Sequence, residues 1–191
     1  MKLNVVVLLL LLLFTTTTCC PSSDRRALLA FRSALHEPYL GIFNSWTGQD
    51  CCHNWYGVSC DLITHRVAAL NLRGESEDPI FERAHRIGFM TGCISPAICD
   101  LPRLSAITIA DWKGISGDIP KCITRLPSLN LRNNLISGLI PPDFGRLTML
   151  SRALLSGNRI TGRIPESLTR IYRLADLDLS GKQLYGTIPP V

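Results

Sequence analysis

The sequence predicts an α/β fold, a right-handed solenoid of stacked coils with one parallel β-sheet along its concave face. Apolar residues recur with a period of 24, so that Leu150 corresponds to Leu174. Each copy contains an LxxLxL stretch, whose alternate apolar side chains fit one face of a short strand. A helical segment and a cluster of cysteines precede the repeats and predict a disulfide-stapled cap. A single coil cannot bury its own apolar edge, so the coils must stack.

Residues 1–19 are predicted to be a secretory signal peptide, although no clean cleavage site is present. A positive charge at Lys2 precedes an unbroken apolar run from Val5 to Phe14. This run is too short to span a bilayer, which takes about 20 residues, so an anchor or re-entrant segment is the weaker alternative. No long apolar run follows it, and we therefore expect an exported protein without a membrane span. Export permits disulfides.

Residues 20–66 are expected to form the N-terminal helical cap. Ser23 or Asp24 can cap a helix that continues through Leu35. Leu28 and Phe31 recur at the spacing of one helix face, which we expect to be buried against the repeats.

The repeats occupy residues 67–191 as about four and a half coils. Their expected bounds are 67–103 with an insert at 75–87, 104–128, 129–149, 150–173 and a partial copy at 174–191. The coil at 129–149 is three residues short, because Leu126 leads directly to Leu129, and we expect it to lose backbone pairing with a neighbour. Since the last copy is partial, we expect the C-terminal cap to be missing. The array therefore looks internally shortened and C-terminally truncated.

One turn position in each coil favours asparagine, whose amide can bond the backbone of the neighbouring coil. Asn134 and Asn158 occupy this position in two coils, while Trp112 and Lys182 occupy it in two others. One extra residue also lies near Trp112. We therefore expect an asparagine ladder that is broken at two coils.

The chain carries a formal net charge of +5, and its 46% hydrophobic content excludes a disordered protein. The basic excess is concentrated in six arginines, which Glu166 alone opposes: Arg146, Arg152, Arg159, Arg163, Arg170 and Arg173. They fall at different repeat positions, which predicts a belt around one coil. Such a belt is suited to solubility, with pectin or another anionic polymer as a further partner. A nucleic-acid groove needs aligned basic residues with aromatics between them, so nucleic acid is not the expected partner.

No constellation of residues predicts an enzyme, and we expect neither a catalytic site nor a cofactor. The four histidines lie in the cap and the insert, away from equivalent repeat positions. Asp176 and Asp178 share one strand face and form the best carboxylate pair, but alternating polar residues on such a strand are typical of a binding or solvated surface. The cysteine cluster lacks a C-x-x-C pair, so a zinc site is not expected.

Two kinds of segment in this chain resemble plant extracellular leucine-rich repeat proteins. They are NSWTGQDCCHNWYGVSCD in the cap and the LxxLxLxxNxLxGxIPxxLxxL copies that follow it. Proteins of this kind include polygalacturonase-inhibiting proteins and receptor ectodomains, and GESEDPIFERAHR is most similar to the plant DNA-damage-repair/toleration group. The resemblance implies two cap disulfides, Cys20–Cys51 and Cys52–Cys60. Cys99 and Cys122 fall on adjacent coils, so they either pair or remain half-buried thiols.

The expected function is recognition of a protein, such as a cell-wall hydrolase or a receptor ectodomain, by a secreted leucine-rich-repeat module of the plant cell wall. The expected contact surface is the solvent-facing side of the concave strands: Asn71, Arg73, Thr108, Asp111, Asn130, Arg132, Arg152, Asp176 and Asp178. Two alternatives stay open. One is a role in DNA-damage repair or toleration, with a plastid location. The other is a shortened product with little function of its own.

Overall fold

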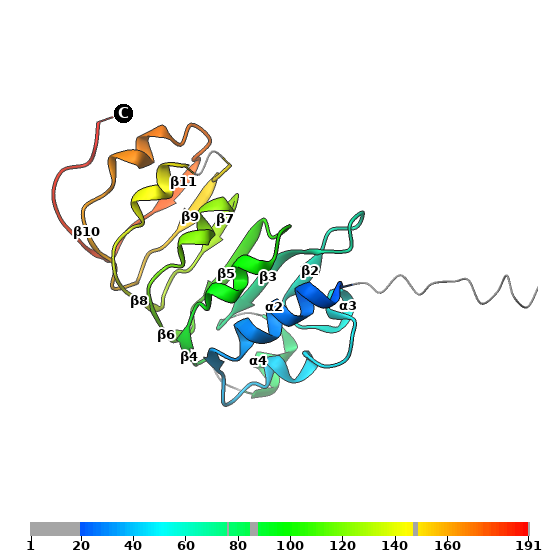
Figure 1. Cartoon of the computed structure of the whole chain (residues 1–191). Coiled ribbons are helices and arrows are strands. Elements are labelled where there is room, and N and C mark those ends of the chain that lie inside the picture. The colour runs from blue at the N-terminus through cyan, green and yellow to red at the C-terminus, as the bar shows by residue number, and fades with distance from the viewer. Residues whose placement is uncertain (1–19, 76, 85–87, 147–148, 191) are drawn as a thin grey trace, which may run out of the picture.

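The computed structural model describes residues 20–75, 77–84, 88–146 and 149–190, and the predicted signal peptide lies outside them. Figure 1 shows a solenoid in which strands from successive coils lie side by side. The larger sheet has the order β11-β9-β7-β5-β3-β2. Its strands are β2 (Val58–Cys60), β3 (Val67–Arg73), β5 (Ala106–Ala110), β7 (Ser128–Asn130), β9 (Arg152–Leu154) and β11 (Asp176–Asp178). All neighbours pair in parallel except β2 and β3, so the predicted α/β solenoid is confirmed.

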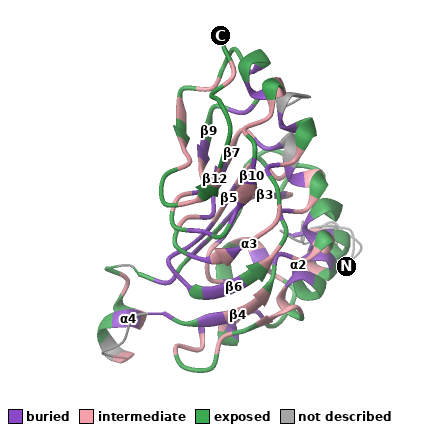
Figure 2. Cartoon of the chain, turned by 90° about the vertical axis from the view of Figure 1, so that its left-hand side faces the viewer, coloured by how far each residue is buried: buried purple, intermediate pink, exposed green. Residues whose placement is uncertain are grey.

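A second set of strands follows the turns of the coils, and a cap strand pairs antiparallel at its edge. It comprises β1 (Leu35–His36), β4 (Met90–Cys93), β6 (Lys113–Gly117) and β8 (Leu135–Ile136) in one sheet, and β10 (Thr161–Gly162) with β12 (Gln183–Leu184) in another. The chain then passes through short 3-10 helices on the side away from the large sheet: η2 (Pro96–Asp100), η3 (Lys121–Arg125), η4 (Pro142–Arg146) and η5 (Glu166–Arg170). Figure 2 shows buried residues concentrated between these layers.

The cap consists of α2 (Ser22–Arg32), η1 (Ile42–Ser45), α3 (Cys51–Asn54) and strand β2. Helix α2 ends three residues earlier than predicted, because Leu35 begins β1 and pairs with Gly92 instead. Asp24 does not cap the helix. Its carboxylate is fully buried, forms an ion pair with Arg66 and accepts a hydrogen bond from the Val67 amide at 3.0 Å. This carboxylate therefore ties the cap helix to the start of the first repeat strand.

The turn position after each strand carries a side-chain N–H donor in all four coils from Trp112 to Lys182. Asn134 Nδ2 donates to the Ile109 carbonyl at 2.7 Å, and Asn158 Nδ2 donates to the Leu131 carbonyl at 2.8 Å. Trp112 Nε1 reaches the equivalent Leu72 carbonyl at 3.1 Å, and Lys182 Nζ donates to Leu155. The expected breaks are therefore wrong, because an indole and an ammonium replace the amide as donors. We call this series the donor ladder.

The three missing residues before β7 do not disturb the sheet, so the expected loss of pairing is wrong. Leu129 pairs in register with Ile107 on one side and with Ala153 on the other. In the complete coils, a hydrogen-bonded turn precedes the strand of the large sheet. Before β11, for example, the Leu174 amide donates to the Ile171 carbonyl at 3.1 Å. The chain omits this turn at Leu126. The shortening thus falls on the side away from the large sheet, and the strand register survives.

The predicted insert forms a projecting arm that includes α4 (Pro79–Ala84), which stands apart from the stacked coils in Figure 2. Its neck is closed by the Gly88 amide, which donates to the Gly74 carbonyl at 2.5 Å. A Cβ atom on Gly74 would lie 2.3 Å from the Asp111 carbonyl oxygen, so the neck requires glycine there. Phe81 is 7% exposed and its ring centroid lies 6.5 Å from that of Trp112. Trp112 therefore serves both the donor ladder and the arm.

Removing one donor from the ladder should destabilise the whole stack. Asn158→Ala removes one of the two side-chain donors to the buried Leu131 carbonyl, which keeps Asn134 Nδ2 at 2.9 Å, and it leaves the Ile136 amide without its acceptor. Because a buried group without a partner is costly, we expect a loss of about 1–3 kcal/mol in the free energy of unfolding. Urea unfolding of the oxidised protein measures it. Asn71→Ala, at an exposed position, is the matched control with an expected change within about 0.5 kcal/mol. Equal losses in the two variants would contradict the ladder's role.

The Lys182 rung should give the protein a distinctive pH dependence. Partial burial lowers the pKa of Lys182 to about 8, although the nearby Asp178 carboxylate opposes this shift. The folded state therefore binds fewer protons than the unfolded state between about pH 8 and the ordinary value of 10.5, and stability should rise with pH in that window.

This rise is measured against Lys182→Asn, which keeps an amide donor but does not titrate. Urea unfolding at pH 7 and about pH 9.5, with Cys93→Ser in both proteins to prevent thiol exchange, gives the comparison. The stability of the parent relative to the variant should increase at the higher pH. An unchanged or decreasing difference would show that the amine is not buried in this rung.

Candidate functional site

The concave sheet places side chains from five successive parallel strands in rows. One row runs through Asn71, Thr108, Asn130, Leu154 and Asp178, which are consecutive partners in the strand register. Asn71 is exposed, and Thr108, Leu154 and Asp178 are half-buried. Asn130 is only 6% exposed. The row therefore crosses all five strands, and its central side chain is buried.

The other predicted surface residues divide between the sheet and its edge. Arg73 and Arg152 are exposed, and Arg132 and Asp176 are half-buried. Asp111 differs from the expectation that it faces solvent. It is 5% exposed and lies in the turn after β5 with a φ of 66°, where it accepts a hydrogen bond from Asn133 Nδ2 at 2.6 Å. Because of the extra residue in this coil, the Asp111 side chain is directed into the protein instead of toward solvent.

Ion pairs within the protein neutralise much of the charge on this surface. Arg152 Nε lies 2.9 Å from a carboxylate oxygen of Asp176 on the next strand. Arg132 Nε lies 3.6 Å from Asp111. The pKa of Asp178 is lowered to about 2, first because the Ser156 hydroxyl donates to its carboxylate and then because Ser180 does so as well. Since Asp178 stays ionised, the Asp176–Asp178 pair does not favour a general acid.

A polar hollow of about 290 Å³ lies where the cap, the first repeat strand and the projecting arm meet. Its lining residues are Tyr56 and Gly57 from the cap, Asn71 and Arg73 from β3, and Asp78 from the arm. Burial, together with the Asp78 charge, raises the pKa of Tyr56. The sequence prediction named Asn71 and Arg73 but missed Tyr56 and Asp78. The position of the insert directly after the first repeat strand is the signal that could have suggested Asp78.

The arginine belt has only one member on the concave sheet, Arg152. The other four with described side chains, Arg159, Arg163, Arg170 and Arg173, are exposed at separate places around the same coil. The Arg146 side chain lies outside the described residues. Arg173 lies over the Tyr172 ring, with its guanidinium carbon 5.7 Å from the ring centroid. This spread does not form a single basic track.

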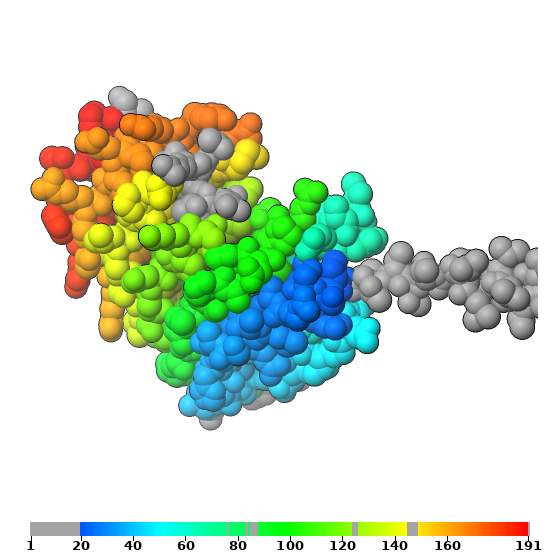
Figure 3. All heavy atoms as spheres, in the orientation of Figure 1, coloured from blue at the N-terminus to red at the C-terminus, as the bar shows by residue number. Residues whose placement is uncertain are grey.

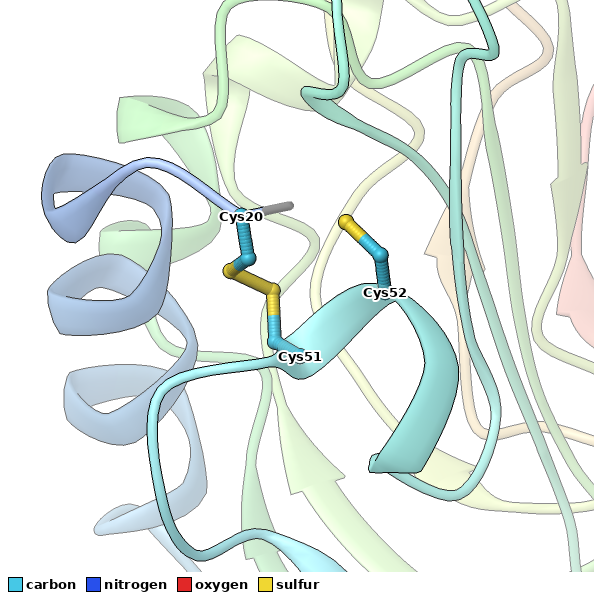
Figure 4. Close-up of side chains that lie close together, drawn as sticks. All are labelled: Cys20, Cys51 and Cys52. Carbon is cyan, nitrogen blue, oxygen red and sulfur yellow. A yellow bond between two sulfur atoms is a disulfide. The ribbon is translucent and has the colours of Figure 1, made fainter. Parts of the chain in front are cut away.

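Three disulfides are present among the described cysteines. Cys20–Cys51 and Cys52–Cys60 staple the cap as implied, with Cα atoms 5.5 and 5.3 Å apart. Cys99–Cys122 joins two adjacent coils, which resolves the open alternative in favour of pairing. Sulfur atoms of Cys20, Cys51 and Cys52 lie within 4.8 Å of one another, and Figure 4 shows Cys20 bonded to Cys51. A metal would need thiolates, whereas these sulfur atoms are held in disulfides.

Comparison with known proteins places the chain in one family. Residues 21–61 match the leucine rich repeat N-terminal domain, and residues 125–147 and 150–171 match the leucine rich repeat. The DNA damage-repair/toleration protein DRT100 of Arabidopsis thaliana is 57% identical over 109 residues, covering 56% of this chain and 29% of the relative. A polygalacturonase inhibitor of Vitis vinifera is 34% identical over 108 residues, covering 56% and 28%. This chain thus spans less than a third of the length of these relatives.

Solved structures agree with these relatives. The BIR2 ectodomain of Arabidopsis thaliana has a TM-score of 0.73 at 27% identity, covering 87% of this chain and 83% of that one. The ectodomain of the Arabidopsis receptor kinase SOBIR1 has a TM-score of 0.68 at 28% identity, covering 89% and 85%. Within the described residues, no helix has the length and apolar composition needed to cross a bilayer. The chain belongs to the leucine-rich repeat proteins, with a leucine rich repeat N-terminal domain ahead of its repeats.

Proposed function

We propose that this chain is a secreted protein-binding module of the plant cell wall, which recognises a partner protein through its concave sheet in defence or signalling. The observation that carries the proposal is the continuous row of side chains across five parallel strands, with the polar hollow at its cap end. The similarity to polygalacturonase inhibitors and to receptor ectodomains supports it.

The surface favours recognition by shape and hydrogen bonding. Because Arg152–Asp176 and Arg132–Asp111 are already paired, a partner gains little from simple charge attraction there. The hollow combines an arginine, a carboxylate, an amide and a phenol, which together supply both donors and acceptors. A polar side chain of the partner that enters this hollow would set the register of the complex along the sheet.

Capture from cell-wall extracts with the secreted, oxidised protein tests the proposal. The double variant Asn71→Ala, Arg73→Ala changes two exposed residues of the hollow and should lose the captured protein, with at least about a tenfold weaker signal. Arg163→Ala, an exposed belt residue, is the matched control and should retain it. Equal retention by both variants would contradict binding at the concave face. A folded parent that captures nothing would favour a shortened product without function.

A role in DNA-damage toleration is the second candidate, supported by the 57% identity to a relative with that name. Binding to DNA through several phosphates gives an affinity that falls steeply with salt. The belt arginines lie at separate places around one coil, which does not provide such a path. A DNA titration at increasing salt distinguishes the two candidates. We expect weak binding whose affinity changes little with salt. An affinity that falls steeply with salt, and less steeply in Arg163→Ala, would favour the role in DNA-damage toleration.

A further inference from the structure

A cavity of about 200 Å³, open to solvent beside the exposed residues Cys99 and Pro102, lies between the first two coils on the side away from the concave sheet. Ile98, Leu101 and Leu104 come from the first coil and the turn that ends it, and Ile107, Ile123 and Leu126 come from the second. Pro102 and the Cys99–Cys122 disulfide complete the described lining. None of these described side chains is charged, and polar atoms of the same residues also reach the cavity surface, so the cavity is suited to a small uncharged molecule that contacts the leucine and isoleucine side chains.

The missing turn explains why this cavity exists. Before β5, the Leu104 amide donates to the Leu101 carbonyl at 3.3 Å, and the turn places the Leu104 side chain in the stack. The next coil passes from Leu126 directly into β7 and supplies no corresponding leucine. Leu104 consequently remains half-buried, whereas Leu150, at the same repeat position further along, is 1% exposed. The cavity lies where the absent leucine side chain would pack.

The disulfide keeps the cavity from collapsing. Cys99 in η2 and Cys122 in η3 lie on its two walls, with Cα atoms 5.6 Å apart. The in-register pairing of β5 with β7 fixes the two coils relative to each other at the sheet. A site that cannot relax leaves the space of a deleted side chain open. The two constraints therefore preserve a preformed site.

We infer that this cavity binds a small, uncharged, apolar molecule of about the size of benzene. An enclosed apolar cavity of about 150 Å³ that is lined by leucine, isoleucine and phenylalanine takes up benzene, so this cavity of about 200 Å³ has sufficient volume. The site is separate from the concave surface and uses no residue of the proposed protein-binding site. It is a consequence of the shortened junction between two coils.

Benzene titration of the oxidised protein with ¹³C-labelled isoleucine methyl groups tests the inference. The methyl signals of Ile98, Ile107 and Ile123, which line the cavity, should shift in a saturable manner. Ile42 in the cap and Ile160 in a later coil are fully buried elsewhere and should shift little. Shifts of equal size at all five isoleucines, or none at the cavity, would overturn the inference.

Two filled variants separate binding from general effects of benzene. The first inserts Pro-Arg-Leu after Leu126, which copies residues 102–104 and restores the missing turn. The second, Leu104→Phe, enlarges a half-buried lining residue and serves if the insertion does not fold. Both should weaken binding by about tenfold or more, because the cavity is occupied by the protein itself. Undiminished binding in a folded filled variant would overturn the assignment of the site.

Discussion

The donor ladder is the interaction on which the rest of the structure depends. In each coil, the carbonyl of the last apolar residue of the LxxLxL stretch lies where the chain turns away from the large sheet. A side chain from the following coil supplies the N–H group, and Trp112, Asn134, Asn158 and Lys182 all do so. Asn134 and Asn158 also donate to the Leu131 and Leu155 carbonyls of their own coils, so each of these amides ties two neighbouring coils together. An amide, an indole or an ammonium group can serve as the donor, provided that its N–H group reaches the carbonyl of the preceding coil.

The extra residue at Trp112 shows how the ladder accommodates a departure from the repeat. Asp111 and Lys113 on either side have positive φ angles of 66° and 62°, which allow the chain to admit one more residue. The indole still reaches its carbonyl, and its ring also packs against Phe81 of the arm. One cost is visible in the next coil, where Asn134 Oδ1 is buried and finds no donor among the described residues. The projecting arm and the irregular rung are thus parts of one arrangement.

The period of 24 predicted the strands, and the resemblance to plant leucine-rich repeat proteins implied the two cap disulfides, because these features depend on spacing along the chain. The features that neither predicted depend on contacts between side chains and backbone groups that only the folded structure brings together. Lys182 and Trp112 do not resemble asparagine in the sequence, yet they donate to equivalent carbonyls. The short coil looked harmful to the sheet, but the lost residues belong to a turn on the other side. Asp78 and Tyr56 are distant in the sequence and meet only because the insert folds back beside the cap.

The closed neck of the arm has a consequence for how this protein can change during evolution. Gly74 and Gly88 touch, so the ends of the insert are as close as the ends of a tight turn. The entropy of closing a longer loop grows only slowly with its length. Insertions, deletions and replacements between these glycines that keep Phe81 against Trp112 would therefore leave the coils beneath them in place. The arm beside the polar hollow is a segment in which new sequences can be tried without refolding the solenoid.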